Sequence, residues 1–302
     1  MKNSRFYKWT GFIFAIILLL SLTACGQIFK RLQENVEGET KKQEKKEVPE
    51  VLKKMQENTE KIISEIQKVK DERAKIARQE DDAAQSENEK QGKSNQQEST
   101  GEEKKQDSSS EANKGDKEEK KQDKGQSEKQ GAQPQVKWPE FEKTIEEFHV
   151  LWNDYEVQAK EDGASSEHIK AFEEKLNALT EQIMAHNEEK TLIAANSLYR
   201  YFPYFLNLYK HNAPPETEEM KYYIEEILIL AQQEKWEETK PLMDDLEKAW
   251  LKCKARMEKQ DKQVNAKIDA ALEDLKEVLP MKNLSLLKFK ANILKNNVND
   301  IK

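Results

Sequence analysis

The segment ETEEMKYYIEEILILAQQ, residues 216–233, has the densest apolar pattern in the C-terminal half of the chain. Its large apolar side chains return every three or four residues, which is the spacing of a helix, and they cover more than one narrow stripe. Pro214-Pro215 ends the helix before this one, because proline cannot continue a helix. We predict a central helix covered by its neighbours, with core residues Tyr223, Ile224, Ile227, Leu228, Leu230 and Ala231.

Six further helical patterns flank this segment, three before it and three after it. No stretch alternates with the period of a strand, and Gly163 is the only glycine after Gly131. We therefore predict an all-α domain over residues 138–302, a helical bundle of about seven helices that is large enough to hold one core. The expected core residues of the flanking helices are Phe141, Ile145, Phe148, Trp152, Tyr155, Ala159, Ile169, Phe172, Leu176, Leu179, Ile183, Leu192, Ala195, Leu198, Tyr199, Phe202, Phe205, Met243, Leu246, Trp250, Cys253, Met257, Val264, Ile268, Leu272, Leu275, Leu279, Leu284, Leu287, Ala291, Leu294, Val298 and Ile301.

Local signals place several helix ends. Gly163 suits a left-handed cap after the first helix, and Ser165 or Ser166 suits the N-cap of the second. Pro203 lies inside the third helical pattern and should kink it, because proline removes a helical hydrogen bond. Asn283 is expected to cap the last helix.

Two parts of the domain align with each other at an offset of 96 residues. Any two amphipathic helices align on apolar spacing, so the weight lies on the capping asparagines and on two Ala-Asn-x-Leu matches. The alternatives of an internal duplication and a chance match both remain open. The aligned pairs are Phe172 with Ile268, Leu176 with Leu272, Leu179 with Leu275, Ile183 with Leu279, Asn187 with Asn283, and 195–198 with 291–294; with two residues of slack, Trp152 aligns with Trp250 and Tyr155 with Cys253.

Residues 50–80 form a separate amphipathic, coiled-coil-like helix in the sequence. Its stripe repeats every three and four residues, but Thr59 and Arg73 stand at core positions and weaken a dimer seam. Self-association through 50–80 is one interpretation, and a single helix that docks on the C-terminal domain or is partly frayed is the other. The stripe consists of Leu52, Met55, Thr59, Ile62, Ile66, Val69 and Ile76.

Residues 81–137 are a charged linker of Gln, Lys, Glu, Ser, Asn, Asp and Gly. Such a segment buries too little apolar surface to offset its ordering entropy, so we predict disorder. A fragment that begins near Gln135 is therefore expected to fold alone.

The N-terminus has three basic residues, an apolar run from Gly11 to Leu20 and then Leu22-Thr23-Ala24-Cys25. The run is short for a membrane span, and the order of these parts is that of a secretory signal. Leu22-Thr23-Ala24-Cys25 resembles the lipobox of bacterial lipoproteins. This resemblance implies a signal peptide over 1–24, cleavage after Ala24, lipidation of Cys25 and a juxtamembrane segment over 25–49. It places the protein on the extracytoplasmic face of the cell membrane, where a diacylated cysteine anchors stably.

Composition excludes several classes of function. The net charge is −7, and loss of the basic signal takes the mature chain to −10, which argues against a nucleic-acid partner. With Cys25 acylated, Cys253 has no partner for an intramolecular disulfide, and its helical spacing favours a small buried residue.

No motif predicts catalysis, a metal or a cofactor. Glu146-x-x-His149 has the spacing of di-iron bundles, but those sites need a second copy, and His168, His186 and His211 do not provide one. The domain has no metalloprotease, nucleophile-elbow or phosphate-loop pattern. We predict that the protein is not an enzyme.

Tyrosines concentrate around one helix-to-helix connection, on both sides of Pro214-Pro215. They lie all round the helices and cannot all face one core. One interpretation is a thick core with tyrosines at its rim, and the other is a pocket or partner surface, since tyrosine suits a boundary between apolar and polar surroundings. The candidate surface residues are Tyr199, Tyr201, Tyr204, Tyr209, Tyr222 and Tyr223.

The sequence thus predicts a lipid-anchored envelope lipoprotein whose helical bundle binds a protein or cell-wall partner. The alternative is a solute- or ligand-binding lipoprotein that works with a transporter and uses the aromatic cluster as its pocket. The absence of strand patterns weakens that alternative, because such proteins usually have two α/β lobes.

Overall fold

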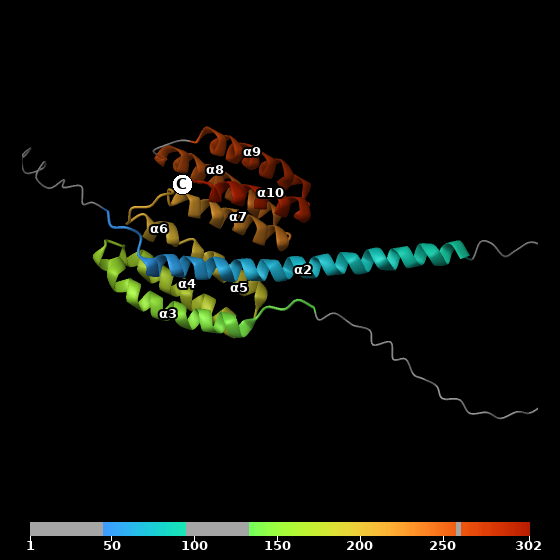
Figure 1. The fold of residues 1–302 in the computed structure, drawn as a ribbon, viewed down its shortest axis with the longest axis horizontal. Helices are drawn as coiled ribbons and strands as arrows, with labels where there is room; N and C mark the ends of the chain where they lie inside the picture. The colour runs from blue at the N-terminus through green and yellow to red at the C-terminus, as the bar shows by residue number, and fades with distance from the viewer. Residues whose placement is uncertain (1–44, 95–132, 258–260) are drawn as a thin grey trace, which may run out of the picture. The chain divides into compact units, whose positions relative to one another are not determined.

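A computed structural model describes residues 45–94, 133–257 and 261–302, and the side chains of these except for 81–94 (Figure 1). These residues contain no β-strand, so the predicted all-α class is confirmed. The predicted signal peptide, Cys25 and most of the predicted linker lie outside the described residues. The helices are α2 (Glu50–Ser94), α3 (Trp138–Glu161), α4 (Ser166–Met184), α5 (Glu188–Tyr199), α6 (Phe202–Leu206), α7 (Glu216–Gln232), α8 (Thr239–Arg256), α9 (Lys262–Val278) and α10 (Leu284–Asn299), with short 3-10 turns at Trp236–Glu238 (η1) and Leu279–Met281 (η2).

The apolar segment that follows Pro214-Pro215 forms α7, which packs against α5, α6, α8 and α10. The prediction of a central, covered helix is confirmed. The other predicted core residues are buried too, apart from a few that are half-buried at the edges of the core. The half-buried ones are Tyr223, Leu230, Met257, Val264 and Leu284.

The predicted helix ends agree with the structure at most positions. Gly163 has a φ of 97°, a left-handed conformation that glycine adopts without strain. The side chain of Ser165 caps α4 by accepting a hydrogen bond from the backbone of His168. Pro203 has a larger effect than the expected kink, because the pattern breaks into two helices, α5 and α6.

Helix α2 belongs to the same folded unit as the C-terminal helices, and this unit extends from Val48 to Lys302. Its stripe packs against α3 and α5 instead of facing solvent, with Leu52, Ile62 and Ile66 fully buried. Thr59, which disfavours a dimer seam, is also buried and donates its hydroxyl to the Met55 carbonyl oxygen at 2.9 Å. The structure therefore agrees with the docked alternative for this stripe.

Helix α2 continues to Ser94, beyond residue 80 where the sequence predicted its end and the start of a disordered linker. The added turns are rich in Ala, Glu, Gln and Lys. These residues favour a helix by intrinsic propensity, so a helix that is started by packing can propagate through them.

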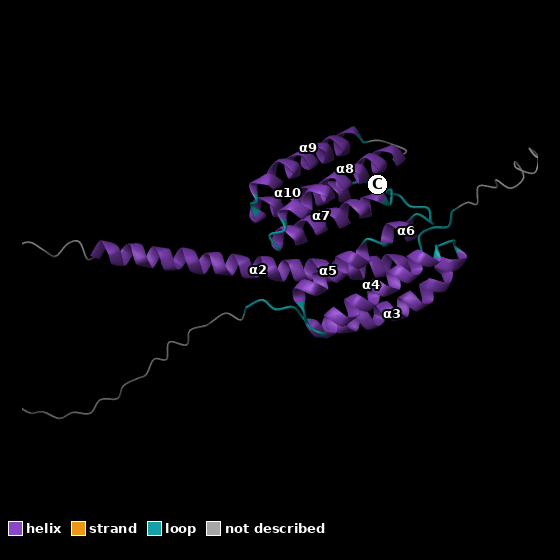
Figure 2. Cartoon of the chain, turned by 180° about the vertical axis from the view of Figure 1, so that it is seen from behind, coloured by secondary structure: helices purple, strands orange, loops and turns teal. Residues whose placement is uncertain are grey.

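The described helices form two bundles of the same topology, which Figures 1 and 2 show from opposite sides. In the first bundle, α2 contacts α3 and α5, and α4 lies between α3 and α5; in the second, α7 contacts α8 and α10, and α9 contacts both α8 and α10. Each bundle has a hydrophobic core of its own. The prediction of one bundle around one core is corrected to two fused bundles, because α2 supplies the fourth helix of the first.

The sequence offset of 96 residues corresponds to a structural repeat. Helices α4 and α9 begin at equivalent positions, as do α5 and α10. Asn187 and Asn283 cap α5 and α10 in the same way, with nearly equal backbone angles and a side-chain oxygen that accepts from the backbone three residues later. The aligned apolar pairs are buried in both bundles.

Helices α2 and α7 also correspond, at an offset of 165 residues that the sequence comparison missed. Thr59 and Ile224 are equivalent positions. Because Thr59 is polar and Ile224 is apolar, this pair weakens the similarity of the two apolar patterns in the sequence. Pro49 and Pro214 are equivalent as well, and each accepts a backbone hydrogen bond at the start of its helix. The matching buried residues are Leu52 and Thr217, Met55 and Met220, Thr59 and Ile224, Ile62 and Ile227, Ile63 and Leu228, and Ile66 and Ala231.

Candidate functional site

The six predicted surface tyrosines separate into buried and half-exposed groups. Tyr199 and Tyr209 are 3% and 1% exposed and belong to the first core, and Tyr222 is also buried. Tyr201 and Tyr223 are half-buried, and Tyr204 is 40% exposed. Three of the six tyrosines therefore belong to the core, and the other three form its partly exposed rim.

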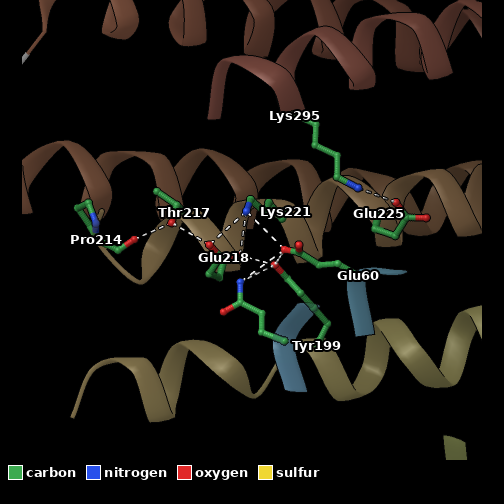
Figure 3. A network of polar contacts seen from close by, with 9 residues as sticks. Glu60, Tyr199, Pro214, Thr217, Glu218, Lys221, Glu225 and Lys295 are labelled. Carbon is green, nitrogen blue, oxygen red and sulfur yellow. Dashed lines mark hydrogen bonds and ion pairs between the residues drawn. The ribbon is translucent and has the colours of Figure 1, made fainter. Parts of the chain in front are cut away.

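Tyr199 joins three helices at the junction of the two bundles (Figure 3). Its hydroxyl lies 2.5 Å from Glu60 Oε1 on α2 and also contacts Glu218 on α7. Lys221 Nζ bridges the two carboxylates, at 3.5 Å from Glu60 Oε1 and 3.2 Å from Glu218 Oε2. Burial, and then the two carboxylates, raise the pKa of Tyr199 well above its usual value, so the phenol stays protonated as a donor.

This network is a structural junction, because its polar groups satisfy one another. The Tyr199 hydroxyl is a single donor between two acceptors, and the ammonium of Lys221 balances the second carboxylate. The cluster is partly buried, since Glu218 is 12% exposed and Glu60 is 42% exposed, and its partnered groups favour one placement of the helices that carry them. Its members link α2 to α5 and α7.

Tyr209 makes a similar polar contact in the first bundle. Its hydroxyl donates to Asp162 Oδ2 at 2.9 Å, next to the turn after α3. Burial raises the pKa of Tyr209 to about 12. Tyr199 and Tyr209 are therefore buried and do not form part of the predicted binding surface.

The rim of the cluster surrounds Arg200, an exposed residue. Its guanidinium lies 5.6 Å from the centre of the Tyr222 ring. The centres of the Tyr222 and Tyr223 rings are 5.0 Å apart. The Tyr201 and Tyr204 ring centres are 6.0 Å apart. Arginine among tyrosines is a combination that protein interfaces favour, because planar groups offer large contact area at low entropic cost.

A cleft of about 380 Å³ begins at Tyr204. It is formed by the turn between α3 and α4, α6, the start of α7 and the end of α8. His168 stacks on Tyr204 with ring centres 4.0 Å apart, and Arg256 Nε pairs with Glu216 Oε1 at 3.2 Å. Burial raises the pKa of Glu219, another lining residue.

Sequence reasoning missed Arg200, His168, Arg256 and Glu219 at this site. Arg200 stands between two predicted tyrosines, so its position in the sequence was a usable signal. The other three come from segments far apart in the chain, and only the tertiary fold brings them together.

His149 Nε2 lies 2.8 Å from Thr180 Oγ1, and among the described residues no group of three His, Cys, Asp or Glu side chains is placed to hold a metal. Cys253 is fully buried, and burial raises the pKa of its thiol to about 12. Asn196 donates to Glu226 Oε2 at 2.7 Å across the α5–α7 contact, whereas its repeat counterpart Asn292 is exposed.

In the described ranges, no helix has both the length and the apolar character needed to cross a membrane. Comparison with known proteins adds no relative: no protein-family model, curated protein or solved structure matches this chain.

Proposed function

We propose that this protein is a non-enzymatic lipoprotein, anchored through Cys25 at the outer face of the bacterial cell membrane, that presents its two fused bundles to a protein or cell-wall partner. The lipobox-like Leu22-Thr23-Ala24-Cys25 supports the anchor. The observation that carries the binding role is the half-exposed tyrosine rim around Arg200. We define this surface as the Tyr–Arg rim: Arg200, Tyr201, Tyr204 and Tyr223.

The Tyr–Arg rim supports a protein partner because its side chains are held in place before binding. Tyr204 stacks on His168, and Tyr223 packs on Tyr222, so little rotamer freedom remains to be lost in a complex. Interfaces usually concentrate their binding energy in such tyrosines and arginines. The network around Tyr199, the residue before Arg200, links α2, α5 and α7 next to this rim.

The test is site-specific photocrosslinking in cells, with the photoreactive residue at position 204. Val157, which is 60% exposed on α3, is the matched control position. A partner crosslinked from 204, absent from 157 and lost when Arg200→Glu is added, supports the proposal. Equal crosslinking from both positions contradicts it.

The second candidate function is capture of a small solute for a transporter, which the cleft beside Tyr204 favours. Its volume of about 380 Å³ suits a small molecule, and its lining combines an aromatic wall with charged groups. Equilibrium dialysis of the mature chain against a mixture of cell-extract metabolites checks this candidate. Retention of a solute that Tyr204→Ala abolishes would favour capture over partner binding.

A further inference from the structure

The second bundle has a cleft of about 350 Å³ at the end where α8 begins and α9 ends. Met243 and Leu279 belong to the second core, and Trp236 packs against it, so the floor of the cleft is apolar. The rim is charged and includes Lys240 and Lys282. This site is separate from the Tyr–Arg rim and from the residues discussed for the proposed function.

The structural repeat supplies a counterpart for this cleft in the first bundle. Trp236 corresponds to Trp138, and Lys282 corresponds to His186. The backbone is the same at the second pair, with φ of 50° at Lys282 and 51° at His186. The two sites therefore share a scaffold and differ in the side chains that it carries.

In the first bundle the imidazole of His186 covers the indole. The rings of Trp138 and His186 stack, with centres 4.9 Å apart and an angle of 12° between planes. His186 Nε2 is fixed by Glu142 Oε1 at 2.7 Å. The indole face is thereby filled by a planar group of the chain itself.

In the second bundle both residues that close the first site are replaced by lysines. Lys282 stands in place of His186, and Lys240 in place of Glu142. Both ammonium groups contact the Glu237 carboxylate instead. Lys240 Nζ lies 2.5 Å from Glu237 Oε2, and Lys282 Nζ lies 3.7 Å from Glu237 Oε1. The side chain of Glu237 is 71% exposed, and among the described residues it supplies the only anion that these two lysines contact.

We infer that this cleft binds a small amphiphilic anion, a molecule with an apolar or aromatic group and a carboxylate or sulfonate. The apolar part lies on Trp236, Met243 and Leu279, as His186 lies on Trp138 in the first bundle. The anionic part takes the place of the Glu237 carboxylate between Lys240 and Lys282. A cleft of this size holds a molecule of medium-chain fatty-acid size, and its apolar floor with few charged groups is typical of small-molecule sites.

The first experiment measures binding of 1-anilinonaphthalene-8-sulfonate by fluorescence to the mature chain, residues 25–302, carrying Cys25→Ser. N-phenyl-1-naphthylamine, which has the aromatic groups without the sulfonate, is the matched probe. We expect the sulfonate to bind at least about tenfold more tightly, because charge-assisted hydrogen bonds to two lysines are lost in the neutral probe. Decanoate should displace the sulfonate. Equal affinity for the two probes would overturn the inference.

The second experiment rebuilds the closed site of the first bundle in the second. Lys240→Glu with Lys282→His introduces the pair that covers Trp138, and we expect loss of sulfonate binding by about tenfold or more. Glu237→Gln should instead strengthen binding, because it frees both lysines. Glu142→Gln with His186→Ala in the first bundle is the control and should leave the high-affinity site unchanged.

The variants separate this site from unspecific dye binding. Circular dichroism and thermal melting of each variant establish that it is folded, and the Glu237→Gln gain does not depend on any loss of stability. Sulfonate binding that persists in the Lys240→Glu, Lys282→His variant would place the dye elsewhere. Weaker binding in Glu237→Gln would show that the lysines do not receive the anion.

Discussion

His186 and Lys282 hold the same left-handed backbone conformation 96 residues apart, with φ of 51° and 50°. Each directly precedes an asparagine that caps the next helix. Non-glycine residues rarely adopt this conformation, so its presence at both positions is stronger evidence for a repeat than matching apolar spacing. The two side chains then diverge, because His186 stacks on Trp138 whereas Lys282 lies at the rim of an open cleft.

This pair yields a prediction about stability. Lys282→Gly should raise the free energy of unfolding by about 0.5–1 kcal/mol. Glycine removes the strain of the left-handed conformation, and the greater conformational entropy of glycine in the unfolded chain offsets only part of this gain. His186→Gly should give no such gain, since it also removes the stack on Trp138 and the bond to Glu142. Urea unfolding of both variants measures the difference. A destabilised Lys282→Gly would contradict the argument.

Helix α2 should contribute to stability as a core helix. Ile62 is fully buried in the first core, and Ile62→Ala should lower the free energy of unfolding by about 2–5 kcal/mol. Lys61→Ala, at the exposed neighbouring position, should change it by less than about 0.5 kcal/mol.

The fragment from Gln135, which the sequence favours as an independent domain, leaves the first core uncovered and should melt well below the chain from Val48. Equal melting temperatures of these two chains would show that α2 docks only loosely.

Alkaline pH should destabilise the fold through its buried tyrosines. The folded pKa of Tyr209 is about 12 against an ordinary value of 10, so the folded state keeps a proton that the unfolded state loses. The stability from this group is complete below pH 10 and is lost as the pH rises from 10 to about 12. Tyr209→Phe should cost about 1 kcal/mol at pH 7 by removing the bond to Asp162, yet show a shallower loss above pH 10. The control is Tyr204→Phe, because the Tyr204 side chain is exposed. Chemical denaturation across this pH range measures the stability of each variant.

Cys25→Ala should abolish lipidation and release the protein from the membrane fraction. Two acyl chains hold a soluble domain stably at a bilayer, and without the cysteine sulfur no thioether can form. Metabolic labelling with a fatty-acid analogue and cell fractionation test this. Cys253→Ala is the matched control and should remain labelled. Unchanged labelling of Cys25→Ala would refute the lipobox assignment.

The sequence by itself determined the features that depend on neighbouring residues. Helical periodicity defined α7 and its core face, and the caps at Ser165 and Asn283 followed from side chains that bond to their own backbone within a few residues. The 96-residue offset was also readable, because the capping asparagines are tied to the start of each helix. These interactions are local, so a single segment contains the information they require.

Only the tertiary structure decided how segments distant in the sequence combine. The stripe of α2 was compatible with a coiled coil and with docking on the bundle, although Thr59 and Arg73 disfavoured the coiled coil, and burial against α3 and α5 distinguishes the two. Tyr199 and Tyr204 are alike in the sequence, but one lies between carboxylates of α2 and α7 and the other at the surface. The open cleft beside Trp236 also has no local signal, because its existence depends on which side chains of separate helices meet. Long-range packing of this kind is a property of the whole fold, since each contact requires partners that the local sequence does not specify.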